Sequence, residues 1–271
     1  MILARKGIAV TALLGMLPLA ASAQWARFPT AGVPKTKDGK PNVNAPTPRT
    51  ADGKPDLSGV WGNPPCKRDC PPGTEQELLP LAALFVDIGW GMKESLPYQP
   101  WAADLVKARM ADDGRSNPDA HCRPIGIVML ETHPYPRRMI QTPGLLTMVF
   151  EKDWTFRQIF TDGHPLPSDP QPWWYGYSSG KWVGDTLVVE TRGFKDDGWL
   201  DFRGHVLTGA ANITERFRRI NYGNLEIDLT IDDPKAYTRP WSVKIKQTLL
   251  LDTDLFEFFC AENEKAVEHF K

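Results

Sequence analysis

The chain has 271 residues, of which 41% are hydrophobic and 24% are charged, and its formal net charge is -1. Charged residues of both signs are spread along it without long runs, which argues against a nucleic-acid or anionic membrane surface as partner. The length suits one large domain or two small ones, and the composition is that of a globular protein rich in Pro and Trp.

Residues 1–23 have the pattern of a secretory signal peptide. Arg5 and Lys6 supply the positive start, residues 8–20 are mostly apolar, and Ala21-Ser22-Ala23 matches a cleavage motif of small residues. The apolar part is shorter than the about 20 residues of a membrane span, and no later stretch approaches that length. We therefore expect cleavage after Ala23, a bacterial periplasmic or secreted location, and no membrane span.

The four cysteines favour disulfide bonds, because exported chains fold in an oxidising environment. Cys66 and Cys70 are close together and flanked by Pro, which favours a local disulfide. A metal pair is the alternative there, but no second Cys or His pair with zinc spacing accompanies them. Cys122 and Cys260 are then left to pair across most of the domain, tying the HCRP segment to the last strand.

Residues 24–57 contain a near-repeat, in which KDGKPNVN is followed by ADGKPDLS. Their Pro, Gly, Lys and Asn content does not allow a buried core, so we expect an extended arm. The arm leads into a single β-rich domain over residues 58–271. A secreted interaction module that uses the arm would leave this larger domain unexplained.

A helical insertion is expected near residues 74–113. Pro100 suits the first turn of a helix and Gly114 suits its end. Trp101, Leu105 and Ala108 fall on one stripe, which we expect to pack against the domain.

After residue 120 the pattern changes to short strands separated by turn signals. The spacing leaves no room for crossover helices, so neighbouring strands should pair antiparallel in a meander. With about nine strands, a barrel or a strongly curved sheet would hide the strand edges, so the expected class is mainly β with short packing helices. The expected strands are 126–130, 138–142, 145–151, 155–161, 186–191, 212–220, 224–231, 241–250 and 255–260.

The strand expected at 212–220 carries charge on its apolar face. Ile213, Glu215, Phe217 and Arg219 alternate onto one side, so if the apolar residues face inward the charged ones do too. Buried charges must be paired, and a mixed apolar and ionisable lining is typical of a small-molecule cavity. The structural alternative is that Glu215 and Arg219 pair with each other near the barrel mouth.

Seven segments resemble a large, mostly uncharacterised family of exported proteins of soil bacteria and sphingomonad-like organisms. They are RTADGKPDLSGVW, PDAHCRPIG, HPYPRRMIQTPG, RQIFTDGHPLP, GKWVGDTLVVETRGF, TERFRR and TIDDPKAYTRPW, and they cover nearly the whole mature chain. In that family the segment after WLD often reads GHPHSE, whereas here it reads GHVLTG. His205 matches the first His, but Leu207 and Gly209 stand where the second His and the acidic residue would be. A chemistry shared by those three groups is therefore in doubt for this chain.

A second resemblance lies in the segment DLSGVWG. Gly59-Val60-Trp61 is similar to the G-x-W signature that opens a strand in lipocalin-like calycin barrels. Together with the strand count, this resemblance implies a calycin-like barrel.

Asp201, His205, Glu215 and Arg216 form the strongest candidate catalytic set. A strand-to-strand connection is expected to bring them close in space. A base, an acid and a cation for a developing oxyanion suit elimination, isomerisation or hydration at a carbon next to a carbonyl. The alternative is an ordinary set of solvated and ion-paired strand residues.

The remaining histidines have catalytic and structural interpretations. Asp119 could orient His121 for acid/base work, or His121 could bind backbone groups beside a disulfide. His133 and His164 both precede Pro, whose rigid backbone can aim them, and Asp162 is expected to initiate a turn. Several histidines could converge on one metal, but no HExxH-type spacing supports this, so we expect no metal.

Trp173, Trp174, Tyr175 and Tyr177 lie within five residues of one another. Such a cluster is either core or a platform for a planar or apolar ligand. A sugar platform is a rival, but the paired carboxylates that glycosidases need cannot be placed. We assign these four aromatic residues, with Arg157, to the binding of a small apolar or aromatic molecule.

The absence of several motifs from the sequence excludes further classes of function. The sequence has no G-x-S-x-G elbow, phosphate loop or dinucleotide fingerprint, so neither a serine hydrolase nor a nucleotide cofactor is expected. Two hypotheses follow: an exported β-barrel enzyme of lyase, isomerase or hydratase type that uses cofactor-free acid/base chemistry, or a carrier that binds the same molecule unchanged. Nothing in the sequence indicates an oligomeric state.

Overall fold

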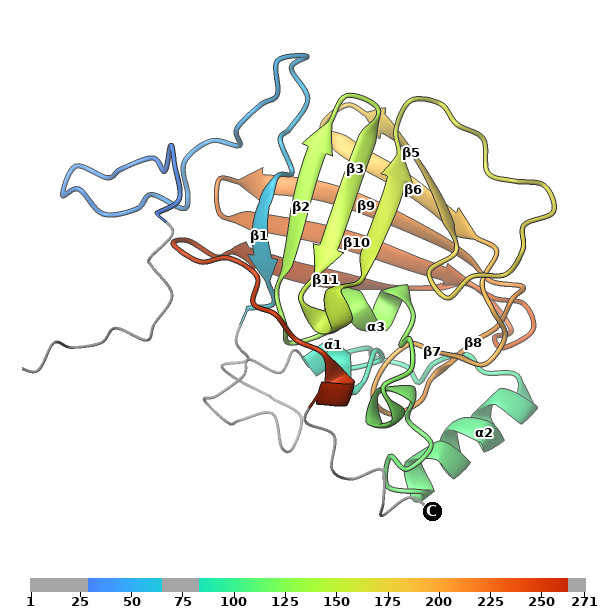
Figure 1. The fold of residues 1–271 in the computed structure, drawn as a ribbon. Helices are drawn as coiled ribbons and strands as arrows, with labels where there is room; N and C mark the ends of the chain where they lie inside the picture. Colours follow the sequence, from blue (N-terminus) through green and yellow to red (C-terminus); the bar gives the residue numbers. More distant parts are fainter. Residues whose placement is uncertain (1–28, 65–82, 263–271) are drawn as a thin grey trace, which may run out of the picture.

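The structure, a computed structural model that describes residues 29–64 and 83–262, is a closed barrel of nine strands (Figure 1). The order around it is β1-β11-β10-β9-β6-β5-β4-β3-β2, and β1 closes it by pairing with both β11 and β2. The predicted class is confirmed, with closure into a barrel. Its strands are β1 (Gly59–Gly62), β2 (Arg137–Thr142), β3 (Leu145–Phe150), β4 (Phe156–Phe160), β5 (Tyr177–Val183), β6 (Thr186–Arg192), β9 (Asn212–Asn221), β10 (Asn224–Asp232) and β11 (Trp241–Leu249).

One pair of neighbouring strands departs from the expected antiparallel meander. β4 and β5 are parallel, and they pair only at Ile159↔Ser178 and Phe160↔Ser179. A parallel neighbour needs a long return connection, which residues 161–176 supply. Two short strands, β7 (Gly198–Trp199) and β8 (Val206–Leu207), form a separate sheet between β6 and β9 in the sequence.

The alternation in β9 follows the prediction. Ile213, Glu215, Phe217 and Arg219 are buried, whereas Arg216 between them is exposed. Opposite them, every second residue of β10 from Leu225 to Ile231 is buried, and the two strands pair along their whole length. The charged side chains of β9 therefore lie inside the barrel with its apolar core.

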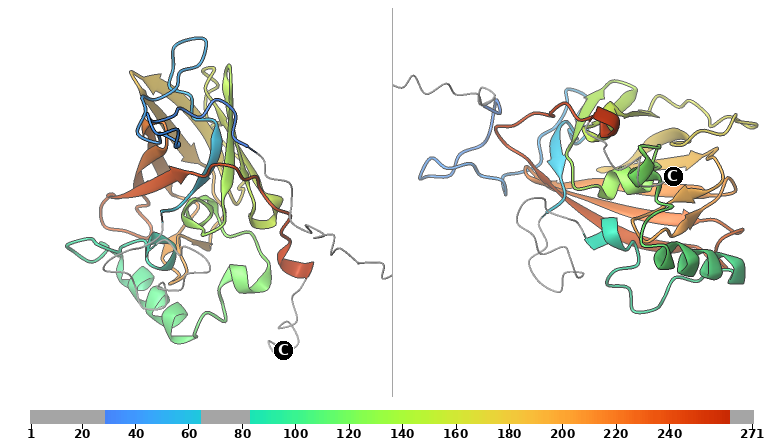
Figure 2. Two further views of the ribbon diagram at one scale, coloured as in Figure 1. Left: turned by 90° about the vertical axis from the view of Figure 1, so that its left-hand side faces the viewer. Right: turned by 60° about the horizontal axis from the view of Figure 1, so that its bottom comes forward.

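The expected strand at 126–130 is wrong, because these residues enter a helix, α3 (Ile127–Thr132). All six of its residues are buried, and it lies at one end of the barrel (Figures 1 and 2). A short apolar run does not distinguish a buried strand from a buried helix. The helix brings Glu131 into the barrel interior, where it contacts Arg157.

Two more strand assignments differ from the structure. Residues 255–260 form no strand, and a single 3₁₀ turn at Cys260–Glu262 ends the described chain. β5 was not predicted, because its sequence YSSGKWV is mostly small or polar. Its backbone pairs with β6 over seven positions, which a side-chain pattern does not report.

The predicted helical insertion contains two helices, α1 (Ala83–Val86) and α2 (Pro100–Ala111). Pro100 begins α2 as expected. Of the predicted packing stripe, Leu105 is half-buried and packs against the core, whereas Trp101 and Ala108 are exposed. Trp101 is exposed and donates its indole N–H to the Lys235 carbonyl at 2.8 Å. Ala102, Val106 and Arg109 face the barrel domain instead. The guanidinium of Arg109 stacks on Trp199, so a charged side chain occupies a packing position.

The near-repeat of the arm folds into two copies of one hairpin, at residues 34–42 and 48–56. In the first, the Thr36 N–H donates to the Lys40 carbonyl at 2.8 Å; in the second, the Thr50 N–H donates to the Lys54 carbonyl at 2.9 Å. Both copies project beside the barrel (Figure 2). The second is fixed to the β5–β6 turn, where Arg49 donates to both carboxylate oxygens of Asp185, at 2.9 and 2.7 Å.

Cys122 and Cys260 form a disulfide, with their Cα atoms 5.4 Å apart. The predicted pairing is confirmed, although Cys260 lies in a 3₁₀ turn and not in a strand. The predicted signal peptide at 1–23 and the Cys66–Cys70 pair lie outside the described residues. Within the described ranges, no helix has the length and apolar character that a membrane crossing requires.

Candidate functional site

A cavity of about 660 Å³ lies along β4 and β5, at the place where these strands separate. Phe156 and Phe160 line it from the exposed side of β4, while Leu166, Trp173 and other residues of the long connection line its far wall. Because the exposed face of β4 contributes, the cavity lies on the outside of the barrel. The barrel interior itself is occupied by the buried core.

Three of the four aromatic residues predicted to bind a ligand line this cavity. Trp173, Tyr175 and Tyr177 all contribute, and the rings of Trp173 and Tyr177 stack with centroids 4.5 Å apart and planes 23° apart. Trp173 remains 53% exposed, so one side of the stack is open. Trp174 does not line the cavity; the Lys195 ammonium lies 5.0 Å from its ring centre.

Backbone contacts hold the aromatic segment in place. The Trp173 N–H donates to the Gly193 carbonyl at 2.9 Å, and the Lys195 N–H donates to the Trp173 carbonyl at 3.0 Å. Gly176 has a φ of +61°, a conformation that favours glycine, and it lets the chain turn into β5. The aromatic rings are therefore carried by a tethered segment.

Arg157 reaches the cavity wall from the inner side of β4. Its side chain is buried, and all five of its N–H groups are used inside the barrel. Nε donates to Ser178 at 3.1 Å, Nη1 to Glu131 and Glu215 at 2.9 and 3.0 Å, and Nη2 to Thr191 at 2.8 Å and to Glu215. The structure thus places Arg157 beneath the aromatic cavity with no N–H group left over for a ligand.

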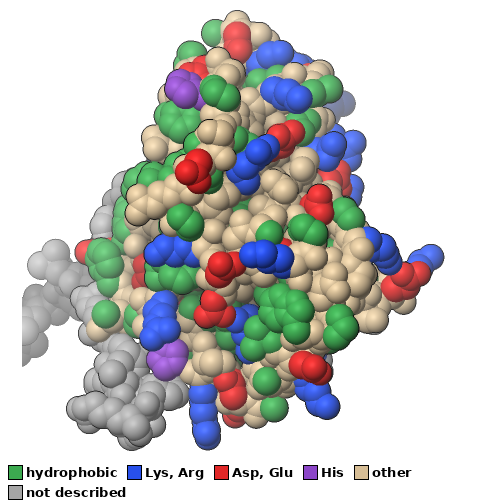
Figure 3. Space-filling model, turned by 90° about the vertical axis from the view of Figure 1, so that its right-hand side faces the viewer, with side chains coloured by type: hydrophobic (Ala, Val, Ile, Leu, Met, Phe, Trp, Pro, Cys, Tyr) green, Lys and Arg blue, Asp and Glu red, His purple; other side chains and the backbone are tan. Residues whose placement is uncertain are grey.

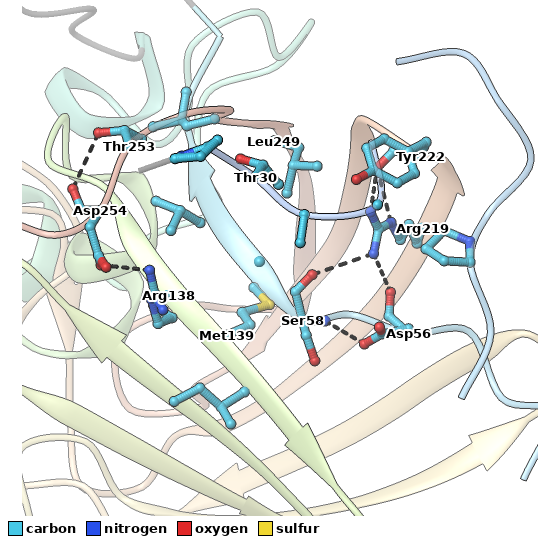
Figure 4. A pocket seen from close by; sticks show the side chains of 18 residues that line it. Thr30, Asp56, Ser58, Arg138, Met139, Arg219, Tyr222, Leu249, Thr253 and Asp254 are labelled. Carbon is cyan, nitrogen blue, oxygen red and sulfur yellow. Dashed lines mark hydrogen bonds and ion pairs between the residues drawn. The ribbon is translucent and has the colours of Figure 1, made fainter. Parts of the chain in front are cut away.

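Glu215 lies in this buried network and not beside His205. Burial and the nearby Glu215 charge raise the pKa of Glu131 to about 8. The structural alternative for β9, a Glu215–Arg219 pair, is wrong. Arg219 donates to the carbonyls of Tyr222, Asn221, Asp56 and Ser58 instead, at a second cavity of about 540 Å³ (Figure 4).

The structure brings Asp201 and His205 together. Nδ1 of His205 contacts the Asp201 carboxylate, which also accepts the backbone N–H groups of Ile88 at 2.5 Å, Gly204 at 3.0 Å and His205 at 3.2 Å. Tyr98 stacks on the imidazole at 6.0 Å, and burial together with the Asp201 charge raises the pKa of this phenol. Nε2 of His205 makes no hydrogen bond in the described part of the chain.

Among the described residues, Asp87, Asp201 and His205 form the one group of side chains that could hold a metal ion. The ligand atoms of Asp87, Asp201 and His205 lie within 4.8 Å of one another. Their oxygens are already engaged, since Arg203 donates to Asp87 at 2.6 Å and Asp201 accepts three backbone N–H groups. We interpret the group as a hydrogen-bonded acid–imidazole pair beside an ion pair.

The other predicted catalytic residues lie elsewhere. Arg216 is exposed on the outer face of β9. His121 lies in the 3₁₀ turn Pro118–His121 and contacts the Arg115 carbonyl at 2.5 Å. Asp119, its proposed orienting group, faces His133 at 3.6 Å and Lys152 at 2.9 Å instead. The predicted catalytic set therefore divides into separate clusters.

The sequence interpretation missed His164 as a cavity residue. Its Nδ1 contacts both carboxylate oxygens of Asp162, at 2.8 and 2.9 Å, and its ring packs beside Phe160 at 5.1 Å. Asp162 also accepts the His164 N–H at 3.1 Å, which is the predicted turn role. The signal was the Asp-x-His spacing before Pro165, which places a carboxylate and an imidazole on the same side of a turn.

The surface beside these sites has no block of one charge. On the face shown in Figure 3, positive and negative side chains are interspersed, and hydrophobic side chains gather between them.

No family model, curated protein or solved structure matches the chain.

Proposed function

We propose that the protein binds a small aromatic or apolar molecule in the cavity along β4 and β5. The observation that carries the proposal is that Phe156, Phe160, Trp173 and Tyr177 converge on one cavity while the first three remain 36% to 60% exposed. Large apolar side chains gathered at one exposed place are typical of binding sites. The volume of about 660 Å³ falls within the usual range of small-molecule pockets.

The ring geometry favours a flat ligand. Trp173 and Tyr177 are stacked, and Trp173 has more than half of its surface free to extend the stack. Offset stacking on Trp or Tyr adds about 0.5 to 1.5 kcal/mol beyond the apolar area that is buried. Polar groups at the rim, including His164 and Ser179, can orient the polar end of such a molecule.

Fluorescence titration with anilinonaphthalene sulfonate tests the binding site. Trp173→Ala should weaken the affinity for the probe by about tenfold, since one stacking contact is worth about 1.4 kcal/mol. Trp101→Ala is the matched control, because Trp101 is 46% exposed on α2 and does not line the cavity. Equal affinity of the two variants would overturn the proposal. Mass spectrometry of the natively purified protein would identify a retained ligand.

Acid/base turnover of a small molecule, at a place apart from the cavity along β4 and β5, is the second candidate function. It is favoured by the Asp201–His205 pair, in which the carboxylate fixes Nδ1 and leaves Nε2 without a hydrogen bond among the described residues. His205→Ala should abolish turnover and leave probe binding unchanged. Because His164 lines the cavity and His205 does not, His164→Gln should be assayed in parallel. Full turnover in His205→Ala would remove His205 as the base.

A further inference from the structure

The edge of β4 that faces β5 is only partly paired. β4 pairs with β3 along its whole length, but it pairs with β5 only at its last two residues, Ile159 and Phe160. Residues 156–158 of β4 extend beyond this pairing, and they line the cavity along β4 and β5. The cavity therefore has the edge of a β-strand as one wall.

Three backbone groups on this edge have no partner. In an antiparallel pair, successive residues direct their N–H and C=O groups to opposite sides. The Phe150 N–H of β3 donates to the Thr155 carbonyl at 2.8 Å. Phe156 and Gln158 follow at alternate positions, so their groups point away from β3 and toward β5. The parallel pairing at Ile159 takes up the Gln158 carbonyl. Within the described chain, no backbone hydrogen bond engages the Gln158 N–H or the N–H and C=O of Phe156.

The opposite wall of the cavity is aromatic. It includes Trp173, Tyr175 and Tyr177, and the stack of Trp173 on Tyr177 has one open side. Unpaired donors and acceptors on a strand edge bind an extended chain through its amide groups, while neighbouring pockets select its side chains. The edge of β4 and the aromatic wall offer both kinds of contact in one cavity.

The charged groups of the cavity favour a neutral ligand over a carboxylate at this edge. Arg157 is the guanidinium of the wall, and its five N–H groups are already used inside the barrel. Asp153, which lies before β4, is paired with Lys152 at 2.6 Å. A secondary amide carries no charge and has one N–H donor and one C=O acceptor, so it matches the free groups of β4.

We propose that the ligand of this cavity is an aromatic amide: a short peptide or peptide-like compound whose ring stacks on Trp173 and whose amide groups pair with Phe156 and Gln158. The inference rests on the binding function proposed for the cavity, and it names the chemical class of the ligand. Each amide hydrogen bond of this kind contributes about fivefold in affinity, since its net gain is typically about 1 kcal/mol.

The test measures the displacement of anilinonaphthalene sulfonate by two compounds of the same shape. N-acetylphenylalanine methylamide has two amide N–H groups, whereas methyl 2-acetoxy-3-phenylpropanoate has ester oxygens in their place. The ester accepts hydrogen bonds but donates none, so it cannot pair with the Phe156 carbonyl. The amide should displace the probe from the wild-type protein at a concentration about fivefold lower than the ester.

A pair of variants tests the same edge from the side of the protein. Gln158→Pro removes the backbone N–H, and proline is tolerated at a strand edge where this N–H has no partner. Gln158→Ala is the matched control, since it also shortens the side chain but keeps the N–H. The amide should bind about fivefold more weakly to Gln158→Pro than to Gln158→Ala, while the affinities of the two variants for anilinonaphthalene sulfonate should agree within about twofold.

Three results contradict the amide proposal: equal displacement by amide and ester, no displacement by the amide, or the same amide affinity in both variants. In each case, a probe affinity that still depends on Trp173 leaves the binding function in place. If the probe affinity does not depend on Trp173, both proposals fall. If Gln158→Pro does not fold, the comparison of amide and ester on the wild-type protein decides, since it needs no variant.

Discussion

Glu131 and Glu215 share one guanidinium nitrogen, because Nη1 of Arg157 donates to Oε1 of each, at 2.9 and 3.0 Å. Glu131 comes from α3 and Glu215 from β9, while Arg157 comes from β4. The contact therefore joins the helix at the barrel end to strands on two parts of the wall. Ser178 and Thr191 extend it to β5 and β6, next to the separation between β4 and β5.

Removal of Arg157 should strongly destabilise the barrel. Arg157→Met leaves Glu215 buried without its counter-charge, and breaking a buried ion pair in this way typically costs about 3 to 5 kcal/mol. Arg216→Met is the matched control on the outer face of β9, and it should change the free energy of unfolding by less than about 0.5 kcal/mol. Urea unfolding measures both. Similar free energies of unfolding for the two variants would show that the buried network around Arg157 does not stabilise the fold.

Glu131 should make stability fall with rising pH. Its pKa is about 8 in the folded protein against an ordinary value of 4.5, so the folded state keeps a proton that the unfolded state releases. The stabilisation is complete below about pH 4.5 and is lost as the pH rises to about 8, with a slope of up to about 1.4 kcal/mol per pH unit. Glu131→Gln keeps the shape of the protonated form and should remove this slope.

Urea unfolding of the wild type and Glu131→Gln across this pH window measures the effect. His133 titrates within part of the same window, because burial lowers the pKa of its imidazole. That contribution has the opposite sign, but it is present in both proteins, so the difference between them isolates Glu131. Parallel curves would mean that Glu131 stays charged inside the barrel.

Much of the barrel could be predicted because its strands alternate. The inward Glu215 and Arg219 followed directly from the period of two in β9. The pattern failed where it is ambiguous, as in α3, where a continuous apolar run fits a helix and a strand equally well. It also failed in β5, whose place is set by pairing with β6 and not by its own side chains.

The candidate site was predictable only in part. The dense aromatic segment pointed to Trp173, Tyr175 and Tyr177, which do meet in one cavity. The position of that cavity depends on the parallel β4–β5 pair, and no local pattern encodes such a non-local pairing. Asp201 and His205 meet because they lie four positions apart across one turn, whereas Glu215 is directed elsewhere by the strand pairing of β9.

The Cys122–Cys260 disulfide should supply a large share of the stability. The two cysteines are 138 residues apart, and a crosslink over such a long loop is worth about 4 to 5 kcal/mol in the chain-entropy model. Cys122→Ser with Cys260→Ser should lose this amount in urea unfolding. The corresponding pair of changes at Cys66 and Cys70, predicted to close a short loop, should lose only about 2 kcal/mol. Equal losses would contradict the entropic explanation.

Gly176 should be needed for both the backbone turn and the cavity. Gly176→Ala introduces a side chain at a φ of +61°, and its Cβ would lie 2.8 Å from the Arg192 carbonyl oxygen and 2.9 Å from Phe194. Gly163→Ala is the control: its φ is also positive, at +93°, but nothing lies within 4 Å of the added Cβ. Both should lose about 1 kcal/mol from backbone strain.

Only Gly176→Ala should lose more stability than this, because the segment that carries Tyr175 and Tyr177 must then move. That movement should also weaken anilinonaphthalene sulfonate binding, whereas Gly163→Ala should leave the affinity of the probe within about twofold. Urea unfolding and probe titration on the same samples separate the two effects. A destabilised Gly176→Ala protein that binds the probe as tightly as the wild type would show that the aromatic segment does not shape the site.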